Sequence, residues 1–302
     1  MNLRQLRYFV AVAEHGSISL AAASVRIAQS AISSQIAALE QELGTPLLLR
    51  HARGVALTEP GRVLLDHAGR IERAFRLAER EVQAAGAGRQ EIAIGIPVSM
   101  SATLTMPLMR AIEGAFPGAQ VRIYEGLTGD LRGWLRSGKV ETAILYGRDD
   151  ADGIDLVPLV DDELVLFGSD PGLPADGRPV SFEELVAVPL FATDEDHPVR
   201  PMLARLAQSR GLDVSFAGRI NSVHQLKALA GSGRGCTILP KVALVNELAA
   251  APDLVHAIHP PIHMRSYIAS MAKESRLVET IKAVAGALIR ADIWPGAAEV
   301  SV

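Results

Sequence analysis

The chain has 302 residues, enough for two or three folded domains. No run reaches the roughly 18 apolar residues of a membrane-spanning helix, and residues 1–16 lack the apolar core and cleavage site of a secretory signal. The single cysteine, Cys236, excludes an intrachain disulfide and is typical of a reducing compartment. We therefore expect a cytoplasmic protein with no membrane contact.

Charge is distributed unevenly along the chain, although the net charge is only −4. Residues 1–90 hold 11 arginines and 8 acidic residues, a net charge of +3, whereas the remainder carries −7. The forked guanidinium of arginine suits paired contacts to phosphate. The asymmetry is modest, which argues against a non-specific nucleic-acid binder, because such a chain would be strongly basic throughout.

Residues 17–44 predict two short helices joined by a tight turn. Ser17 or Ser19 can cap the first helix, Ser30 can cap the second, and Gly44 ends it. The apolar side chains of the second helix follow at steps of four, three and four, which places them on one face: Ile32, Ile36, Leu39 and Leu43.

The opposite face of this second helix opens with short polar side chains: Gln29, Ser30, Ser33 and Ser34. Short side chains let a helix enter the major groove of DNA deeply, and Gln and Ser can hydrogen-bond base edges or phosphates. Periodicity alone favours a plainer interpretation, an ordinary amphipathic helix pair whose polar first turn only caps the helix.

Residues 46–61 predict a short hairpin that leads into another helix. An apolar strand precedes a turn at Gly54, and Thr58 can cap the helix that follows. Arg50 and Arg53 lie on this hairpin, where arginines suit contacts to phosphates or to a narrow minor groove. Each is equally well explained as a solvated surface charge.

A long helix is predicted from about Glu59 to Ala84, roughly 40 Å at about 1.5 Å per residue. Its apolar residues recur with heptad spacing and are called the apolar seam below: Leu64, Ala68, Ile71, Phe75, Ala78 and Val82. Charged residues flank this narrow stripe, so we expect it to pair with a second chain rather than with the chain's own C-terminal part. Dimeric DNA readers need two recognition helices one duplex turn apart, and such a helix provides that spacing.

Residues 1–62 resemble, without a gap, the DNA-binding domain of the LysR-type transcriptional regulators. The resemblance implies an N-terminal all-α winged helix-turn-helix over residues 1–58, a linker or dimerisation helix and joint over 59–88, and an effector-binding domain over 89–302. It is carried by Leu3, Leu6, Phe9, Val12, Ser17, Ala21, Ala22, Ile27, Gln29, Ser30, Ala31, Ser33, Gln35, Ile36, Leu39, Glu40, Leu43, Gly44, Leu47, Arg50, Arg53, Leu57, Thr58 and Gly61.

The resemblance also implies a function. It indicates a sequence-specific transcription regulator rather than an enzyme, which binds double-stranded promoter or operator DNA and a small-molecule effector and needs no cofactor. It further implies a homodimer through the linker helix, a homotetramer, and contact with RNA polymerase. Ser34 stands where the family often carries a basic residue. The expected DNA contacts are Gln29, Ser30, Ser33, Ser34, Arg50 and Arg53.

After a flexible joint at residues 84–88, the pattern changes to alternating strands and helices. Strands at 92–96, 121–124 and 142–146 are followed by a second set that begins at 164–168. This alternation predicts a mostly parallel sheet with helices on both faces.

Two such sets with a late return of the chain predict two lobes joined by two crossings, near Asp161 and near Arg265. Lobe I then comprises about 89–161 and 266–302, and lobe II about 162–265. The family resemblance implies the same C-terminal α/β two-lobed effector domain, an architecture that resembles periplasmic binding proteins.

Open α/β sheets bind ligands beyond the carboxyl ends of their strands, at helix starts. Ser99, Met100 and Ser101 follow the first strand and Thr128 follows the second, so hydroxyls combine there with free backbone N–H groups in a trap for a small anion. Under the resemblance, family ligand contacts map onto Ser99 and Thr128. Plain helix capping is a second role for the same hydroxyls.

In the second lobe, His197 and Arg200 are candidates to neutralise a carboxylate or a sulfate, and Ser222 opens another helix. A surface role for each is an equal alternative. Together with the helix-start hydroxyls, these residues predict an anionic effector bound between the lobes.

The sequence predicts neither a metal site nor a catalytic site. His256, His259 and His263 straddle Pro260-Pro261 and so cannot share one helix face. The alternative to a regulator is a solute-binding or enzymatic α/β protein with an incidental helical arm, which would be a monomer and would not bind DNA.

Overall fold

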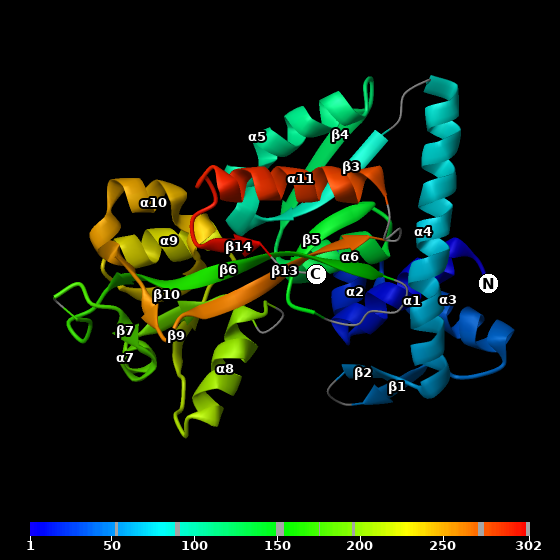
Figure 1. Ribbon diagram of the computed structural model, residues 1–302. Coiled ribbons are helices and arrows are strands. Elements are labelled where there is room, and N and C mark those ends of the chain that lie inside the picture. Colours follow the sequence, from blue (N-terminus) through cyan, green and yellow to red (C-terminus); the bar gives the residue numbers. More distant parts are fainter. Residues whose placement is uncertain are drawn as a thin grey trace. The chain divides into compact units, whose positions relative to one another are not determined.

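The computed structural model describes residues 1–51, 54–87, 91–148, 154–174, 176–194, 197–270 and 275–299 (Figure 1). The contacts divide the chain into an N-terminal unit, Met1–Gln83 with Arg136–Lys139, and a C-terminal unit, Ala84–Leu135 with Val140–Val302. Among the described residues, no helix is long and apolar enough to span a bilayer.

The N-terminal unit consists of three short helices, a hairpin and a long helix. The apolar stripes of the three short helices form one core, because helices this short are marginal unless they bury a face. Fully buried there are Phe9, Val12, Ile32, Ile36 and Leu39. The elements are α1 (Leu3–His15), α2 (Ile18–Ser24), α3 (Gln29–Leu43), β1 (Leu48–His51), β2 (Gly54–Leu57) and α4 (Glu59–Ala87).

The ends of α2 and α3 confirm part of the sequence prediction and correct part of it. The Ser17 hydroxyl caps α2 by accepting from the Leu20 N–H, and Gly44 ends α3 in the left-handed conformation with φ 69°. Ser30 does not cap α3, because the helix begins one residue earlier and its N-cap is Ala28, which makes no side-chain hydrogen bond. Leu43 was expected on the buried face of α3 but is 41% exposed.

The hairpin is tied to α3 and to the start of α4 by specific polar contacts. The Glu40 carboxylate accepts from the backbone N–H groups of Leu47 and Leu48 at 2.7 and 3.1 Å. Thr58 caps α4 as predicted, since its Oγ1 accepts from the Gly61 N–H at 3.0 Å. These contacts fix where the hairpin leaves the helical core and where α4 begins.

The C-terminal unit is built on a ten-stranded sheet whose central path runs β4-β3-β5-β13-β6-β10-β8-β9. Its elements are β3 (Glu91–Pro97), α5 (Val98–Ala115), β4 (Gln120–Gly126), α6 (Thr128–Arg136), β5 (Thr142–Tyr146), β6 (Asp155–Ser169), β7 (Val180–Ser181), α7 (Phe182–Ala187), β8 (Leu190–Ala192), α8 (Val199–Ser209), β9 (Phe216–Arg219), α9 (Val223–Gly231), β10 (Gly235–Pro240), α10 (Val245–Ala250), β11 (Val255–His256), β12 (Ile258–His259), β13 (Ile262–Ser270), α11 (Arg276–Arg290) and β14 (Ala297–Glu299).

Two parallel groups of strands are joined by the long strands β6 and β13. In the first group β4, β3 and β5 are parallel, and in the second β9, β8 and β10 are parallel. β6 and β13 are antiparallel to each other and pair Asp161 with Arg265, the two positions near which the crossings were predicted. The Arg265 guanidinium donates two hydrogen bonds to the Asp161 carboxylate, at 2.7 and 2.6 Å. The sequence predicted only 164–168 of the long β6.

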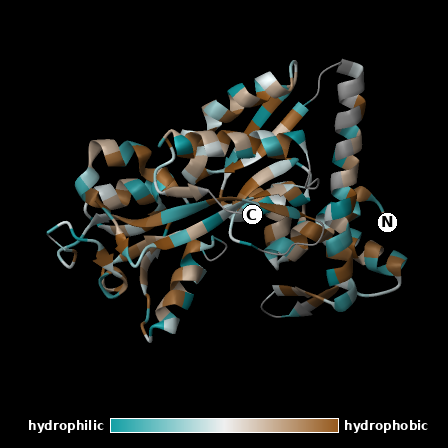
Figure 2. Ribbon diagram, viewed as in Figure 1, coloured by the Kyte–Doolittle hydropathy of each residue, from teal (hydrophilic) through white to brown (hydrophobic). Residues whose placement is uncertain are grey.

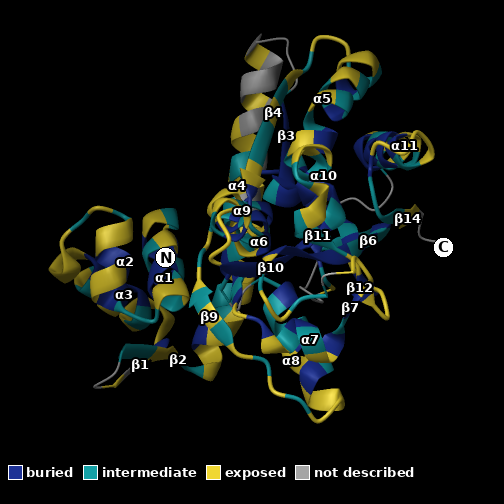
Figure 3. Ribbon diagram, turned by 90° about the vertical axis from the view of Figure 1, so that its left-hand side faces the viewer, coloured by how far each residue is buried: buried dark blue, intermediate teal, exposed yellow. Residues whose placement is uncertain are grey.

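Buried apolar side chains concentrate on the strands of this sheet and on the helix faces that cover it. β5 and β10 are buried at every residue, which is typical of strands covered on both faces. Figure 2 shows brown, hydrophobic stretches along the strands of this sheet, and Figure 3 shows β10 in dark blue, the colour of buried residues. The carboxyl ends of β3 and β4 lead directly into α5 and α6, and that of β8 leads into the segment before α8, so polar residues follow each of these strand ends.

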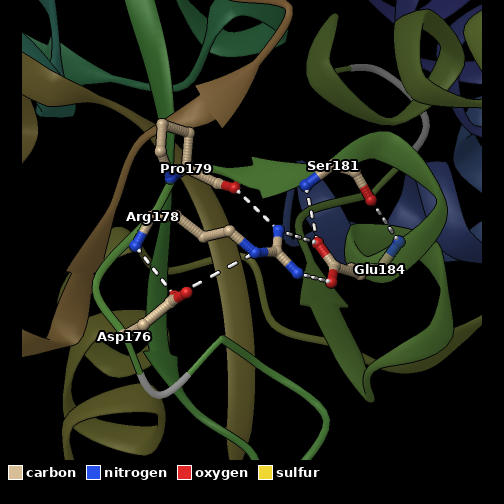
Figure 4. A network of polar contacts seen from close by, with 5 residues as sticks. All are labelled: Asp176, Arg178, Pro179, Ser181 and Glu184. Carbon is tan, nitrogen blue, oxygen red and sulfur yellow. Dashed lines mark hydrogen bonds and ion pairs between the residues drawn. The ribbon is translucent and has the colours of Figure 1, made fainter.

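A network at the start of α7 shows how strongly local contacts can fix a helix end (Figure 4). Ser181 and Glu184 form a capping box, in which each side chain accepts a hydrogen bond from the backbone N–H of the other residue. Arg178 donates to both carboxylate oxygens of Glu184, at 3.0 and 2.5 Å. These hydrogen bonds, that from Arg178 foremost, lower the pKa of Glu184 to about 2.

Candidate DNA interface and effector cleft

The polar face of α3 carries the residues that the sequence predicted as DNA contacts. Gln29, Ser30 and Ser34 are exposed, and Ser33 is half-buried. Ser19 donates to the Gln29 side-chain oxygen at 3.0 Å, and the Ser34 hydroxyl donates to the Ala31 carbonyl at 3.0 Å. The first turn of α3 therefore presents short hydrogen-bonding groups on the surface of the unit.

The two hairpin arginines cannot be placed with the same detail. Arg53 lies outside the described residues, and so does the side chain of Arg50, whose backbone is part of β1. Sequence reasoning missed another cation: Arg26, in the turn before α3, is exposed and has φ 56°. A left-handed conformation is uncommon for a residue with a side chain, and no sequence pattern around Arg26 indicates it.

A small cavity lies beyond the carboxyl ends of strands from both parallel groups. It has a volume of about 160 Å³ and is lined from the start of α6 and from the segments that follow β8 and β9. Its lining residues are Leu127, Gly129, Asp130, Asp194, His197 and Asn221. The cavity, called the cleft below, is therefore at the position that the strand-end rule predicts for a ligand.

The residues predicted at the start of α5 are occupied by structural contacts. Ser99 is buried, and its hydroxyl donates to the Tyr146 hydroxyl at 3.4 Å. Met100 is fully buried in the main core. Ser101 donates a hydrogen bond to the Glu125 carboxylate.

Two other predicted residues offer unused hydrogen-bonding atoms. Thr128 is 1% exposed, and its Oγ1 has no hydrogen-bond partner among the described residues. His197 lines the cleft, and its Nδ1 is likewise buried without a partner in the described part of the chain. Burial lowers the pKa of His197 to about 4, so the imidazole is neutral at pH 7. It therefore does not supply the positive charge that the sequence analysis expected of it.

Arg200 and Ser222, the remaining predicted residues, are absent from the lining of the cleft. The Arg200 guanidinium lies over the Phe216 ring, 4.5 Å from its centroid. Ser222 is the N-cap of α9, where its hydroxyl accepts from the Gln225 N–H at 3.3 Å. Of the predicted cations, neither His197 nor Arg200 thus places a positive charge on the lining.

Sequence reasoning missed the three most polar lining residues. Asp130 lies in the first turn of α6, and its carboxylate accepts from the Leu127 N–H at 3.3 Å. Asp194 and Asn221 follow β8 and β9, and the Asn221 side chain exchanges hydrogen bonds with the backbone and carboxylate of Asp194. The strand-end rule applied to every strand, rather than to hydroxyls alone, indicates all three.

A buried carboxylate, Asp162, joins the crossing strands to the C-terminal segment. It is 1% exposed and accepts from the Tyr146 hydroxyl at 2.9 Å and from the Trp294 indole N–H at 2.7 Å. Burial raises the pKa of Asp162 to about 6, although both hydrogen bonds oppose the shift. Since Ser99 donates to Tyr146, the network continues to the start of α5.

Two family models match this chain. Residues 3–62 match the bacterial regulatory helix-turn-helix protein of the lysR family, and residues 85–292 match the LysR substrate binding domain. The nitrogen assimilation regulatory protein nac of Klebsiella aerogenes is 32% identical over 286 residues, which cover 94% of this chain and 93% of that protein. OxyR of Escherichia coli, a DNA-binding transcriptional dual regulator, is 29% identical over 248 residues, 82% of this chain and 81% of OxyR.

Solved structures show the same fold. An OxyR mutant of Corynebacterium glutamicum with bound H2O2 superposes with a TM-score of 0.56 at 21% identity, and covers 100% of this chain and 98% of its own. Full-length BenM superposes with a TM-score of 0.56 at 22% identity, and covers 98% of this chain and 99% of its own. The predicted fold class, a helix-turn-helix domain followed by an α/β effector domain, is therefore confirmed, and the chain belongs to the LysR family of DNA-binding transcriptional regulators.

Proposed function

We propose that this regulator binds operator DNA as a homodimer and that a small molecule in the cleft changes that binding. The observation that supports the homodimer is the apolar seam of α4. Three of its members are exposed, Ile71 by 39%, Phe75 by 44% and Val82 by 73%. The seam runs from Leu64 to Val82, about 27 Å at about 1.5 Å per residue, and an exposed apolar stripe of this kind on a helix is stabilised by a second copy of itself.

The DNA-reading surface in this proposal is the polar face of the first two turns of α3. Gln29, Ser30, Ser33 and Ser34 would contact base edges or phosphates, and the positions of Arg50 and Arg53 on the hairpin suit phosphate or minor-groove contacts. The exposed Arg26 adds a cation in the turn that precedes this helix. The proposed domain limits are 1–58 for the DNA-binding domain, 59–88 for the linker and 89–302 for the effector domain.

The effector site in this proposal is the cleft, because it lies where two parallel strand groups end and retains unpartnered polar atoms. A ligand there acts thermodynamically only by favouring one arrangement of the regulator over another. The finer predictions are a homotetramer, contact with RNA polymerase, a cytoplasmic location and an anionic effector. The last of these finds little support in the cleft, because none of the lining residues in the described part of the chain is a lysine or an arginine.

A gel-shift assay with the DNA upstream of the chain's own coding region tests the DNA-binding part. We expect a specific, salt-sensitive complex, since phosphate contacts release counterions. Ser30→Asp places a negative charge on the proposed surface and should weaken the complex at least about tenfold. Gln41→Asp puts the same charge on an exposed position near the other end of α3 and should leave binding nearly unchanged.

Light scattering of the full chain tests the assembly. The proposal requires a mass of two or four chains, and Phe75→Asp in the apolar seam should shift the mass towards one chain. A wild-type mass of one chain without a specific DNA complex would instead support a monomeric solute-binding protein.

A further inference from the structure

The lining of the cleft has an unexpected charge. The six lining residues that the structure describes include two carboxylates, those of Asp130 and Asp194, and no lysine or arginine. The one histidine among them, His197, is neutral at pH 7 because burial lowers its pKa to about 4. An anion placed there would face two negative charges in a partly desolvated site, where Coulomb repulsion is stronger than in water.

Each carboxylate has a hydrogen-bond donor beside it, and these donors are uncharged. Asp130 accepts from the Leu127 backbone N–H at 3.3 Å, a long contact. Asp194 accepts from the Asn221 side-chain amide. Each carboxylate has capacity for about four hydrogen bonds, so both retain acceptor sites for a further donor.

A second observation, independent of the carboxylates, also points to a ligand. His197 Nδ1 is buried without a partner among the described residues, and this histidine lines the cleft. The Thr128 hydroxyl, between the lining residues Leu127 and Gly129, is also buried and finds no partner in the part of the chain that the structure describes. Buried polar atoms of this kind are normally satisfied, and a neutral imidazole or a hydroxyl can accept a hydrogen bond from a ligand N–H group.

We propose that the effector is an organic cation, a primary amine or a guanidine, whose charged nitrogen lies between Asp130 and Asp194 and donates to the unpartnered atoms beside them. This inference rests on the proposed effector function of the cleft. Among the described residues there is no group of three or more potential metal ligands, which favours an organic cation over a metal ion. The volume of about 160 Å³ fits a small ligand rather than a drug-sized one.

Calorimetry with the full chain tests the charge of the ligand. The probes are 1,4-diaminobutane and agmatine as cations, and succinate and sulfate as anions. We expect both cations to bind the wild type and neither anion to do so. Asp130→Asn and Asp194→Asn should each weaken cation binding at least about tenfold, since each keeps the shape of the side chain and removes one charge.

The matched control is Asp213→Asn, which removes an exposed carboxylate from the same unit outside the lining and should leave cation binding unchanged. Circular dichroism verifies folding, and either cleft variant suffices if the other fails to fold. Binding of succinate or sulfate overturns the inference, as does the absence of cation binding or equal cation binding by all variants. A wild type that fails to bind operator DNA instead overturns the proposed function, so the two failures are distinguishable.

Discussion

The two units of this regulator differ in how far apart in sequence their decisive contacts lie. In the N-terminal unit, Glu40 binds the backbone seven and eight residues later, and Thr58 caps the helix that starts at the next residue. In the C-terminal unit, the Trp294 indole binds a carboxylate 132 positions earlier in the chain. Local contacts can be recognised in a sequence window, whereas distant ones depend on the topology of the sheet.

The largest expected effect concerns Gly61, near the start of α4. A Cβ at this position would lie 2.1 Å from the Leu47 carbonyl oxygen, a backbone atom that cannot move without displacing the hairpin. Gly61→Ala should therefore destabilise the N-terminal unit by more than about 3 kcal/mol and abolish operator binding. Urea unfolding and gel shifts measure the two effects.

The matched control lies in the C-terminal unit. A Cβ at Gly114, in α5, would meet nothing within 4 Å. Gly114→Ala should leave stability unchanged or raise it by up to about 1 kcal/mol, because alanine favours the helix. If Gly61→Ala left the free energy of unfolding unchanged, as this control should, α4 would not pack against the Leu47 carbonyl as closely as described.

The sequence predicted the N-terminal unit well because its signals are short-range. The Ser17 cap, the Gly44 helix end and the Thr58 cap each follow from a few neighbouring residues, and all three are confirmed. Ser30 was the exception: Ala28 adopts the extended N-cap conformation, so the serine is already the second residue of α3 and cannot cap it. The helix-capping preferences of the amino acids cannot decide which of two residues, two positions apart, is the N-cap.

The cleft was predicted less well, for a reason that is also physical. Strand ends indicated its location, but which polar residues face it depends on how β8 and β9 align with β3 and β4 on the far side of two crossing strands. Asp194 and Asn221 are hydrogen-bonded to each other 27 positions apart. The length of β6 was also underestimated. Its first part contains polar residues that pair with β13, a strand about 100 positions later in the chain.

The next prediction tests whether the Glu40 contact anchors the hairpin. Glu40→Ala leaves the Leu47 and Leu48 N–H groups without their acceptor and should cost about 3 kcal/mol of unfolding free energy. Glu40→Gln keeps an acceptor oxygen and should cost less than half as much. Equal losses in the two variants, measured by urea unfolding, would show that the charge rather than the hydrogen bonds matters.

Two neighbouring carboxylates of the C-terminal unit, those of Asp161 and Asp162, should make the free energy of unfolding depend on pH in opposite directions. Burial raises the pKa of Asp162 from 3.8 to about 6, so between these values the native state holds a proton that the unfolded chain has lost. The free energy of unfolding therefore falls as pH rises from about 4 to 6, by no more than about 3 kcal/mol. Asp162→Asn should remove this fall, as measured by urea unfolding across the pH range.

Asp161 provides the opposite case. The hydrogen bond from Arg265 lowers the pKa of Asp161, so its stabilising contribution is present above the unfolded pKa and is lost as the pH falls. In the wild type this loss lowers the free energy of unfolding at acid pH, and Asp161→Asn should abolish that part of the decrease. The effect should be small because the ion pair with Arg265 is partly exposed. Parallel pH profiles for the two variants would contradict the burial of Asp162.

The smallest expected effect is the response of Cys236 to peroxide. Several relatives are named hydrogen peroxide-inducible genes activators, and the single thiol of this chain can be tested for such a response. Cys236 is fully buried in β10, and burial raises its pKa to about 11, so almost none of it is the reactive thiolate at pH 7. It is also the only cysteine, which excludes an intrachain disulfide. Peroxide at concentrations that oxidise free cysteine should leave operator binding of the wild type and of Cys236→Ala equally unchanged. A peroxide response lost in Cys236→Ala would place the sensing chemistry in the thiol rather than in the cleft.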